Sequence, residues 1–529
     1  MLFTSYEFLL FLGIVFLLYY IIPKKLQWPF LLLASYLFYF IANPWYLLYI
    51  MATTITVYLT ARAIERKKER FKDWYNSQKK QLDREQKKLL KEKEKKKEFH
   101  LLLLGLLLNL GILAVVKYTN FAISNINSLF QLFGGTEISF INIIVPMGIS
   151  FYTFQSLGYL IDIYYGKYNA EKNPFRFALF VSFFPQLVQG PISRFNDLSK
   201  SLFEQHKAEW KTISFGLERI LWGFFKKLVI ADRILPAVNL IIHDTDTYKG
   251  GFVLIGMLFY ALELYADFTG GIDITIGTAQ TLGIHITENF KRPYFSKNIK
   301  EYWKRWHITM GTWFTDYIFY PISVCQPMLK INKFSRKHFG NIIGKRVSVY
   351  LSSFVVWFTT GIWHGASWNF IVWGLGNFVV IMISQEFEPL YERFHKRFHV
   401  SDKLYYRMFQ VIRTVLLMSC LRMFDCYRDV PLTFRMFGSM FADFQISNFS
   451  RESFLSLGLA GFDYLILAVG LIILVTVSLL QRKGSVREQI ADMKAPCRFV
   501  VWYGLFLAVL VFGAYGIGYD ASQFIYNQF

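Results

Sequence analysis

The sequence predicts an all-helical protein that crosses a membrane many times. Two observations lead to this prediction: long uncharged apolar stretches recur along the chain, and the remaining charges are mostly basic. Apolar residues make up 54% of the 529 residues, charged residues make up only 18%, and the mean hydropathy is +0.32. Soluble domains are less apolar and more highly charged. Since a helix needs roughly 20 apolar residues to cross the hydrocarbon core, we expect about eleven spans and some half-spans in one membrane-embedded domain, 1–529.

The basic surplus fits the cytoplasmic edge of a bilayer. Lys and Arg number 58 and Asp and Glu 37, which leaves a formal net charge of +21. Cytoplasmic loops retain Lys and Arg, which there meet anionic headgroups. Binding of nucleic acid needs a hydrated basic face, whereas these basic clusters separate uncharged stretches, so we expect no nucleic-acid partner. The 4 cysteines are too few and too scattered for a disulfide framework or a metal site.

The first elements are a membrane helix and a helical hairpin. Phe8–Ile22 is apolar, and the Pro23–Lys25 segment that follows it lacks the small residues of a signal-peptide cleavage site, so this helix should remain attached. Leu26–Ala61 has 36 residues without a charge and is broken at Asn43–Trp45, where Pro44 interrupts the helical pattern. Each half is about the length of one span.

A charged insert follows the hairpin. Glu65–Glu98 holds 15 Lys or Arg and 8 Asp or Glu, in a composition that favours helix but offers almost no core. By the charge-bias rule this segment is cytoplasmic. We interpret it as a solvated helical insert near lipid headgroups, and the alternative is a docking site for a cytosolic partner.

Later stretches are less regular. Ile141–Tyr165 and Trp303–Tyr320 mix apolar residues with Gly, Ser, Thr and Asn, which indicates backbone buried in a bundle or re-entrant elements. Basic loops are expected at Lys291–Arg305, Lys330–Arg346, Arg393–Arg413 and Arg482–Arg498. The remaining candidate spans are Leu101–Val116, Phe177–Val188, Ile213–Ile230, Phe252–Ile284, Ile308–Val324, Val347–Trp363, Phe370–Ile383, Val411–Leu421, Tyr464–Leu480 and Val500–Tyr519.

Two histidines lie in apolar surroundings, where ionisable groups are costly and therefore functional candidates. His364 closes an uncharged run that begins at Val347, and Gly361 and Gly365 leave room beside its ring. A neutral imidazole there can take a proton from a hydroxyl and return it to a leaving thiolate. The alternative is a buried histidine satisfied by a carbonyl group.

The second histidine is His307, which follows Trp303 and Trp306 and lies 57 residues before His364. An amphipathic helix at the membrane interface is the competing interpretation of this segment. Between residues 303 and 373 lie 7 of the 13 tryptophans, which favours one shared wall: Trp303, Trp306, Trp313, Trp357, Trp363, Trp368 and Trp373.

Three carboxylates lie within a further apolar stretch. Glu263 and Asp267 share a helix face, and Asp273 follows. Pairing with a basic residue such as Arg292 or Arg305 is the structural interpretation, and ion conduction or a proton relay is the alternative. The chain has no G-x-S-x-G, P-loop or H-E-x-x-H motif, and His395 and His399 lack a third ligand and fit a solvated helix face, so no metal site is expected.

Taken together, five segments resemble the signatures of the membrane-bound O-acyltransferases, and within them the bacterial branch of the alginate O-acetyltransferase membrane subunit. They occupy residues 140–375 in the family's order, which predicts the catalytic core there. The matching segments are Pro146–Gln155 with Tyr159 and Asp162, Phe184–Ile192, Glu288–Tyr294, Trp303–Thr309 and Trp363–Asn369.

The resemblance implies a helical bundle, thin at its centre, with a tunnel that admits the donor from the cytoplasm. It assigns His364 as the catalytic histidine and His307 as the second active-site histidine. We expect Trp363, Asn298, Lys304, Arg305, Asp267 and Asp273 to bind substrate. One departure concerns the acceptor site, because Thr269-Gly270-Gly271-Ile272 stands where the family has Ser-Gly-Tyr-Ser between the two aspartates.

By this resemblance the protein moves an acyl group, expected to be acetyl, from acetyl-CoA or another thioester toward hydroxyls of an exported polysaccharide, with no tightly bound cofactor. The implied partners are membrane lipid, acyl-CoA or an acyl carrier protein, an extracytoplasmic hydrolase-like subunit and the polysaccharide, in a bacterial cell membrane. Three alternatives remain: D-alanyl transfer from a carrier protein to teichoic acid, a membrane transporter, and a non-catalytic scaffold.

Overall fold

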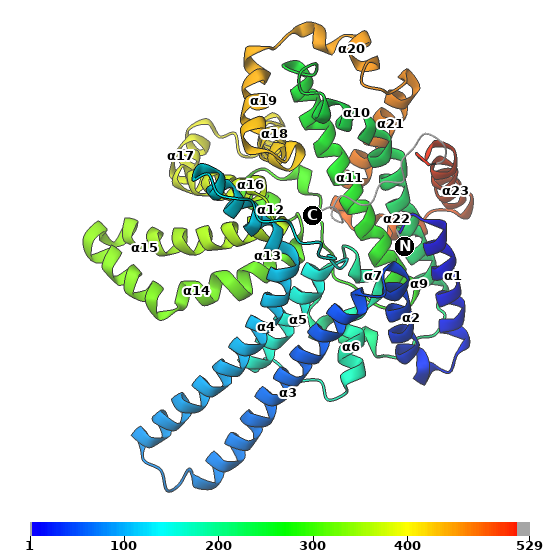
Figure 1. The fold of residues 1–529 in the computed structure, drawn as a ribbon. Helices are drawn as coiled ribbons and strands as arrows, with labels where there is room; N and C mark the ends of the chain where they lie inside the picture. The colour runs from blue at the N-terminus through cyan, green and yellow to red at the C-terminus, as the bar shows by residue number, and fades with distance from the viewer. Residues whose placement is uncertain (1–2, 516–529) are drawn as a thin grey trace. The chain divides into compact units, whose positions relative to one another are not determined.

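The computed structural model describes residues 3–515, and every regular element in that range is a helix (Figure 1). The all-helical prediction is therefore confirmed. Within the described range, seven helices are long and apolar enough to cross a membrane, and α1 (Tyr6–Ile21) is a shorter apolar helix. The larger number of spans stays a prediction. The last predicted span, Val500–Tyr519, corresponds to α23 (Ala495–Phe512), and its residues beyond 515 lie outside the described residues.

The helices form two compact units. The first comprises the chain up to residue 213 together with 278–287, and the second comprises 214–277 and the chain from 288 onward. The division of the chain into functional segments stays a prediction.

In the first unit, the predicted break in the second apolar stretch is present. The helix α2 ends at Ala42, and the side-chain oxygen of Asn43 accepts a hydrogen bond from the backbone of Trp45 at 3.0 Å before α3 begins. The helix α5 is buried along almost its whole length, as its mixture of small and polar residues predicts. The remaining helices of this unit are α2 (Gln27–Ala42), α3 (Tyr46–Gln78), α4 (Arg84–Leu132), α5 (Ile149–Tyr165), α6 (Pro174–Ser182), α7 (Phe184–Leu187) and α8 (Phe195–Leu202).

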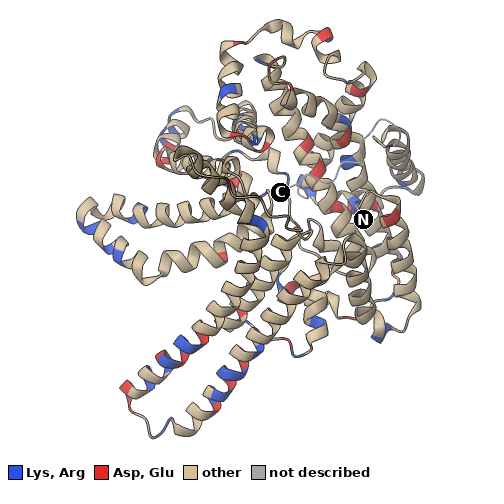
Figure 2. Ribbon diagram, in the orientation of Figure 1, with Lys and Arg blue, Asp and Glu red and all other residues tan. Residues whose placement is uncertain are grey.

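The charged insert is a continuation of two membrane helices. Figure 1 shows α3 and α4 side by side, and Figure 2 shows Lys, Arg, Asp and Glu concentrated at the ends where they join. Asp83 caps α4, because its carboxylate accepts from the backbone of Gln86 at 2.7 Å while the Gln86 side chain accepts from the backbone of Asp83. The insert is thus a helical hairpin.

The second unit contains the predicted broken elements. Between residues 299 and 324 the chain forms short helices and a π-helical turn instead of one span. Most of α9 (Trp210–Phe224) and of α11 (Gly251–Thr281) lies in this unit. Its other helices are the π-helical turn η2 (Phe225–Ala231), α10 (Asp232–His243), α12 (Ile299–Trp303), α13 (Ile308–Phe314), the π-helical turn η4 (Thr315–Phe319), α14 (Tyr320–Val324), α15 (Gln326–His364), α16 (Trp368–Glu386), α17 (Glu388–Phe398), α18 (Leu404–Tyr427), α19 (Val430–Ala442), α20 (Arg451–Leu455), α21 (Gly461–Leu480), α22 (Val486–Ala491) and α23.

Two basic segments expected as loops are largely helical. Lys330–Arg346 lies inside α15, which is kinked at Gly340 with φ of 73° and ψ of 172°. Of the predicted loop Arg393–Arg413, only residues 399–403, between α17 and α18, are outside a helix. These basic side chains lie mostly on exposed helix surfaces, where charge does not oppose helix formation. Charge alone therefore does not distinguish loop from exposed helix.

Candidate active site

His364 is the last residue of α15. Gly365 follows in an extended conformation, and the chain then turns into α16. The two helices approach closely at glycines: a Cβ on Gly361 would lie 2.6 Å from the Phe370 carbonyl oxygen, and one on Gly374 would lie 2.5 Å from that of Trp357. These glycines bring α15 and α16 into backbone contact and thereby position the His364 ring.

His307 immediately precedes α13 as its N-cap residue, in a left-handed conformation with φ of 48° and ψ of 54°. Non-glycine residues rarely adopt this conformation, and it persists only where neighbouring structure holds it. Asn289 does so. Its carbonyl oxygen accepts from Ile308 N at 2.9 Å, and its side-chain oxygen accepts from the Thr309 backbone at 3.1 Å and from the Thr309 hydroxyl at 2.9 Å. The backbone conformation around His307 is thus held by the segment that contains Asn289.

Both histidines contact the indole of Trp363. The centroid of its ring system lies 5.9 Å from that of His307 and 5.1 Å from that of His364. Both imidazoles are buried, with exposed fractions of 0% and 3%. The fold therefore gathers two histidines that are 57 residues apart in the sequence into one aromatic cluster.

Four further tryptophans join this cluster. Trp373 contacts His364 with a centroid distance of 4.4 Å, and Trp303 contacts both Trp357 and Trp373 at 5.0 and 5.7 Å. Phe268 links Trp306 to His307. Trp368 differs, because it begins α16 with 56% of its surface exposed. The predicted shared wall thus includes Trp303, Trp306, Trp357, Trp363 and Trp373.

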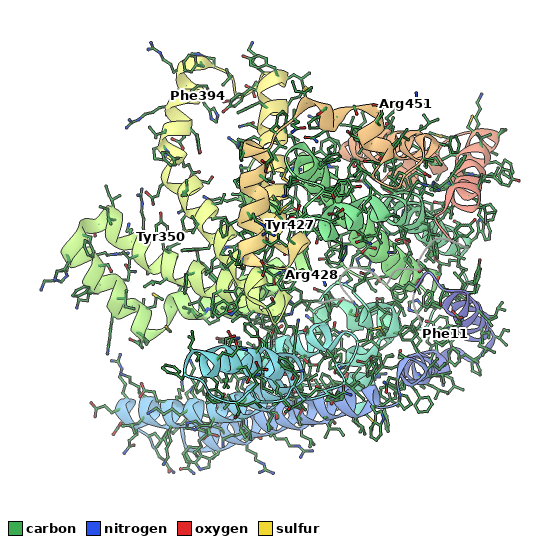
Figure 3. All side chains as sticks on the ribbon, turned by 45° about the horizontal axis from the view of Figure 1, so that its top comes forward. Phe11, Tyr350, Phe394, Tyr427, Arg428 and Arg451 are labelled. Carbon is green, nitrogen blue, oxygen red and sulfur yellow. The ribbon has the colours of Figure 1, made fainter. Side chains whose placement is uncertain are left out.

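A buried ion pair that was not predicted from the sequence supports the wall. Arg422 and Asp425 on α18 are paired at 2.7 Å and almost fully buried. The guanidinium of Arg422 lies 5.0 Å from the Trp373 ring centroid and 5.1 Å from that of Trp306. Such contacts attract the cation to the ring faces. The sequence pattern that could have identified this pair is two opposite charges with (i, i+3) spacing in an apolar helix. They lie a few residues before α18 ends at Tyr427 (Figure 3).

The surroundings keep His307 neutral. Burial disfavours the imidazolium form, and the positive charge of Arg422 adds to this effect, so the pKa of His307 lies well below its usual value. His307 lies outside the seven candidate spans. A neutral ring can donate one hydrogen bond and accept another.

Three predicted donor-binding residues lie on the surface of this region, away from the buried rings. Asn298 is exposed and caps α12, accepting from the backbone of Glu301 at 2.9 Å. Lys304 is exposed, and Arg305 pairs with Glu301 at 2.5 Å. Their role in binding substrate stays a prediction, and Asn298 and Arg305 also have structural partners.

The two aspartates of α11, Asp267 and Asp273, are paired, although with other cations than Arg292 or Arg305. Lys227 contacts Asp267 at 2.6 Å and Asp232 at 2.7 Å. Asp273 contacts Lys226 at 2.5 Å and Arg219 at 2.9 Å. Among the described residues, Glu263 Oε2 is buried without a hydrogen bond.

Glycines bring α9 and α11 together and so make this pairing possible. A Cβ on Gly223 would lie 2.6 Å from the carbonyl oxygen of Gly270, and one on Gly270 would lie 2.9 Å from that of Gly223. Gly270 belongs to the segment that departs from the family pattern. The cations that neutralise the aspartates lie on either side of Gly223 in the chain, Arg219 in α9 and Lys226 and Lys227 in η2.

A cavity of about 790 Å³ lies beside the aromatic cluster in the second unit. Phe290 and Ile308 line the cavity. The ring of Phe290 neighbours that of His307, and Ile308 is the residue that follows His307 in the chain. Its walls combine apolar rings such as Trp222 and Trp502 with charged groups that include Asp273. The cavity is large enough to hold a small molecule that has both apolar and polar groups. A tunnel that crosses the unit stays a prediction.

Comparison with known protein families matches residues 171–427 to MBOAT, the membrane-bound O-acyltransferase family. This range includes both histidines, Asn289 and the Arg422–Asp425 pair.

Individual relatives extend the similarity. The chain is 33% identical over 366 residues to a protein of Pseudomonas syringae pv. tomato named "Probable alginate O-acetylase AlgI", covering 68% of this chain and 64% of that one. A protein of the same name from Azotobacter vinelandii is 31% identical over 372 residues, 70% and 69% of the two chains. A Helicobacter pylori protein named "Peptidoglycan O-acetyltransferase" is 29% identical over 322 residues, 56% and 57% of the two chains. The chain thus spans about two thirds of the length of the first two relatives.

Proposed function

The chain belongs to the membrane-bound O-acyltransferase family, and from this premise we propose that it moves an acetyl group from a thioester donor toward hydroxyls of an exported or cell-surface polysaccharide. The names of its relatives, alginate O-acetylase and peptidoglycan O-acetyltransferase, support a polysaccharide acceptor. The observation that carries the proposal is the convergence of His307 and His364 on Trp363.

In the proposed reaction His364 is the general base. Its neutral imidazole takes the proton of the acceptor hydroxyl, and the oxygen attacks the thioester carbonyl carbon. The tetrahedral intermediate collapses, the C–S bond breaks, and the thiolate takes the proton back from the imidazolium. A general base in this position contributes roughly 10²- to 10⁴-fold to the rate.

His307 is proposed to stabilise the charge that develops on the carbonyl oxygen. Because its ring is neutral and the backbone that follows it is held by the Asn289 contacts, one ring N–H can donate to that oxygen with little reorganisation. The Arg422–Asp425 pair is a positioning element, since it supports the tryptophans and not the reacting atoms.

The cavity beside Phe290 and Ile308 is proposed to hold the pantetheine arm of the donor, whose apolar and amide groups match its mixed walls. In this scheme the donor arrives as acetyl-CoA or as an acyl carrier protein on the cytoplasmic side. An extracytoplasmic hydrolase-like subunit then completes transfer to the polymer, in a bacterial cell membrane.

The test replaces each histidine by alanine in cells that acetylate their surface polymer. We expect His364→Ala to abolish polymer O-acetylation and His307→Ala to reduce it at least tenfold. His338→Ala is the matched control, because this histidine is exposed on α15 outside the aromatic cluster. Equal amounts of each variant in the membrane must be verified by immunoblot. Unchanged acetylation in His364→Ala would rule out the mechanism.

The D-alanyl alternative differs only in the donor and acceptor. Incubation of membranes with labelled acetyl-CoA or with labelled aminoacyl carrier protein separates the two, because only the true donor loses its label to the protein's products. The transporter alternative predicts ion flux in liposomes that persists in His364→Ala. The pairing of Asp267 and Asp273 with lysines and an arginine favours a structural role for these carboxylates over an ion pathway.

A further inference from the structure

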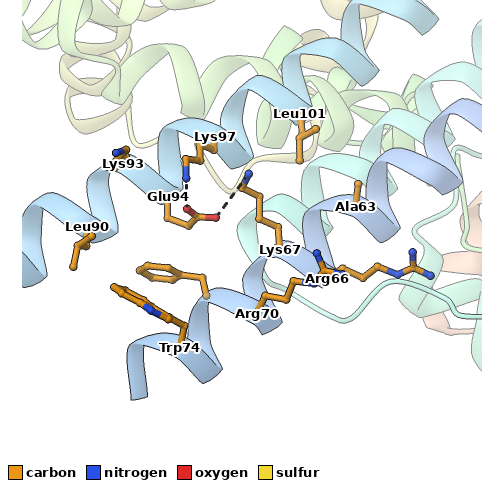
Figure 4. A pocket seen from close by; sticks show the side chains of 11 residues that line it. Ala63, Arg66, Lys67, Arg70, Trp74, Leu90, Lys93, Glu94, Lys97 and Leu101 are labelled. Atoms are coloured by element: carbon orange, nitrogen blue, oxygen red, sulfur yellow. Dashed lines mark hydrogen bonds and ion pairs between the residues drawn. The ribbon is translucent and has the colours of Figure 1, made fainter. Parts of the chain in front are cut away.

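The hairpin of α3 and α4 contains a cleft that the proposed reaction does not use. It has a volume of about 670 Å³ and lies between the charged halves of the two helices (Figure 4). Five cations line this hairpin cleft: Arg66, Lys67 and Arg70 from α3, and Lys93 and Lys97 from α4.

The charges are unevenly divided between the cleft and the rest of the hairpin. Of the 15 basic and 8 acidic residues in 65–98, five basic residues but only one acidic residue, Glu94, line the cleft. Glu94 contacts Lys97 at 3.3 Å and Lys67 at 3.9 Å. More than half of the segment's net positive charge therefore converges on one concave surface, which attracts a multiply charged anion.

Flat apolar surface accompanies the charge. The rings of Phe71 and Trp74 lie one turn apart with centroids 6.1 Å from each other and planes inclined by 30°. Trp74 is 45% exposed, and Leu90 completes this apolar part of the cleft (Figure 4). An exposed indole beside cations provides a surface on which a planar ring can stack.

The position of the rings favours a water-soluble ligand. The inner end of the cleft is at Ala63 and Leu101, where the apolar stretches of α3 and α4 begin. Trp74 follows Ala63 by 11 residues, which corresponds to about 16 Å along the helix axis. The headgroup layer is only about 5–7 Å deep on each side of a bilayer. The aromatic end of the cleft therefore extends beyond the headgroups into water.

We propose that the hairpin cleft binds the nucleotide part of a coenzyme A thioester, with the adenine on Phe71 and Trp74 and the phosphates on the five cations. Coenzyme A combines a planar base with a diphosphate and a phosphomonoester, about four negative charges at neutral pH, which matches the surplus of cations in the cleft. This inference rests on the proposed function. It identifies coenzyme A, not a carrier protein, as the molecule that carries the acetyl thioester. The cleft raises the donor concentration at the cytoplasmic surface.

The test measures binding of radiolabelled coenzyme A to the full chain in nanodiscs of zwitterionic lipid by equilibrium dialysis. The cleft variant Arg66→Gln/Arg70→Gln/Lys93→Gln should weaken binding about tenfold or more, because it removes three charge-assisted contacts. Trp74→Ala should weaken it severalfold. The control Lys79→Gln/Lys80→Gln/Lys87→Gln removes the same net charge from the same hairpin outside the cleft, and its affinity should stay within about twofold. Circular dichroism verifies that helix content is retained.

Activity measurements separate this inference from the proposed function. The cleft variant should raise KM for acetyl-CoA and leave kcat unchanged, whereas His364→Ala should remove transfer and leave coenzyme A binding intact. Equal coenzyme A affinity in the cleft and control variants would overturn the inference, with the proposed function untouched. A loss confined to binding of anionic lipid vesicles, or of an acidic carrier protein, would also overturn it and assign the cleft to that ligand.

Discussion

Two regions of the second unit bury ionisable side chains, and they differ in what these side chains contact. In the α9–α11 region each aspartate contacts a cation directly, as Asp267 contacts Lys227 and Asp273 contacts Lys226. In the aromatic cluster the two titratable rings, His307 and His364, lie against indoles instead. The first region neutralises its charge inside the fold. The second places its imidazoles among aromatic rings, and an imidazole is the side chain that general acid–base chemistry most often uses.

The comparison predicts that the two regions respond differently to mutation. Breaking a buried ion pair leaves an uncompensated charge and lowers stability. Removing an imidazole from an aromatic cluster leaves no such charge, so stability changes less while the reaction loses its base.

The largest effect on stability is expected for Lys227→Met. This change leaves Asp232 and Asp267 without their shared cation, and we expect the free energy of unfolding to fall by about 3–5 kcal/mol. Denaturant unfolding in detergent micelles measures it. The combined variant Lys227→Met/Asp267→Asn should recover part of the loss, because one of the two stranded charges is gone. A Lys227→Met protein as stable as the parent would show that the pair contributes little.

A smaller effect is expected for Asn289→Ala. The Thr309 backbone and hydroxyl, both buried, lose their acceptor, at a cost of about 1–3 kcal/mol. Because the same contacts hold His307, the rate of acyl transfer should fall more than stability alone explains. Asn289→Asp retains an acceptor oxygen and serves as the control. If both variants transfer acetyl at the parental rate, Asn289 does not position His307.

The smallest effect is expected for Asn377→Leu. Its side-chain oxygen accepts from the indole N–H of Trp303 at 3.2 Å, so the change should cost about 1 kcal/mol of stability. Acyl transfer in membranes should fall only severalfold, since Trp303 lies one ring away from His364. Adding Trp303→Phe removes the indole N–H that Asn377→Leu leaves without its acceptor. The free energy of unfolding of the double variant should therefore fall by less than the sum of the losses in the two single variants. Strict additivity would contradict a direct bond.

The sequence predicted the helical class and the hairpin break at Asn43–Trp45, and it singled out the two histidines that the fold gathers around Trp363, whose catalytic role stays a prediction. It failed to identify the partners of the carboxylates, because Arg292 and Arg305 are nearer candidates in the signature region than Lys226 and Lys227. The pairing depends on how α9 packs against α11, which hydrophobic periodicity does not encode. Asn289 and Arg422 were missed for the same reason, since each acts on a segment distant in sequence.

The central claim is that His307 and His364 serve one reaction centre, and a double-mutant cycle in acetyl transfer tests it most directly. Rates are measured for His307→Ala, His364→Ala and the combined variant with the same donor and acceptor. Residues of one catalytic unit give strongly non-additive losses. We predict that the double variant is no slower than about the slower single variant. A double variant whose loss equals the product of the two single losses would contradict the claim.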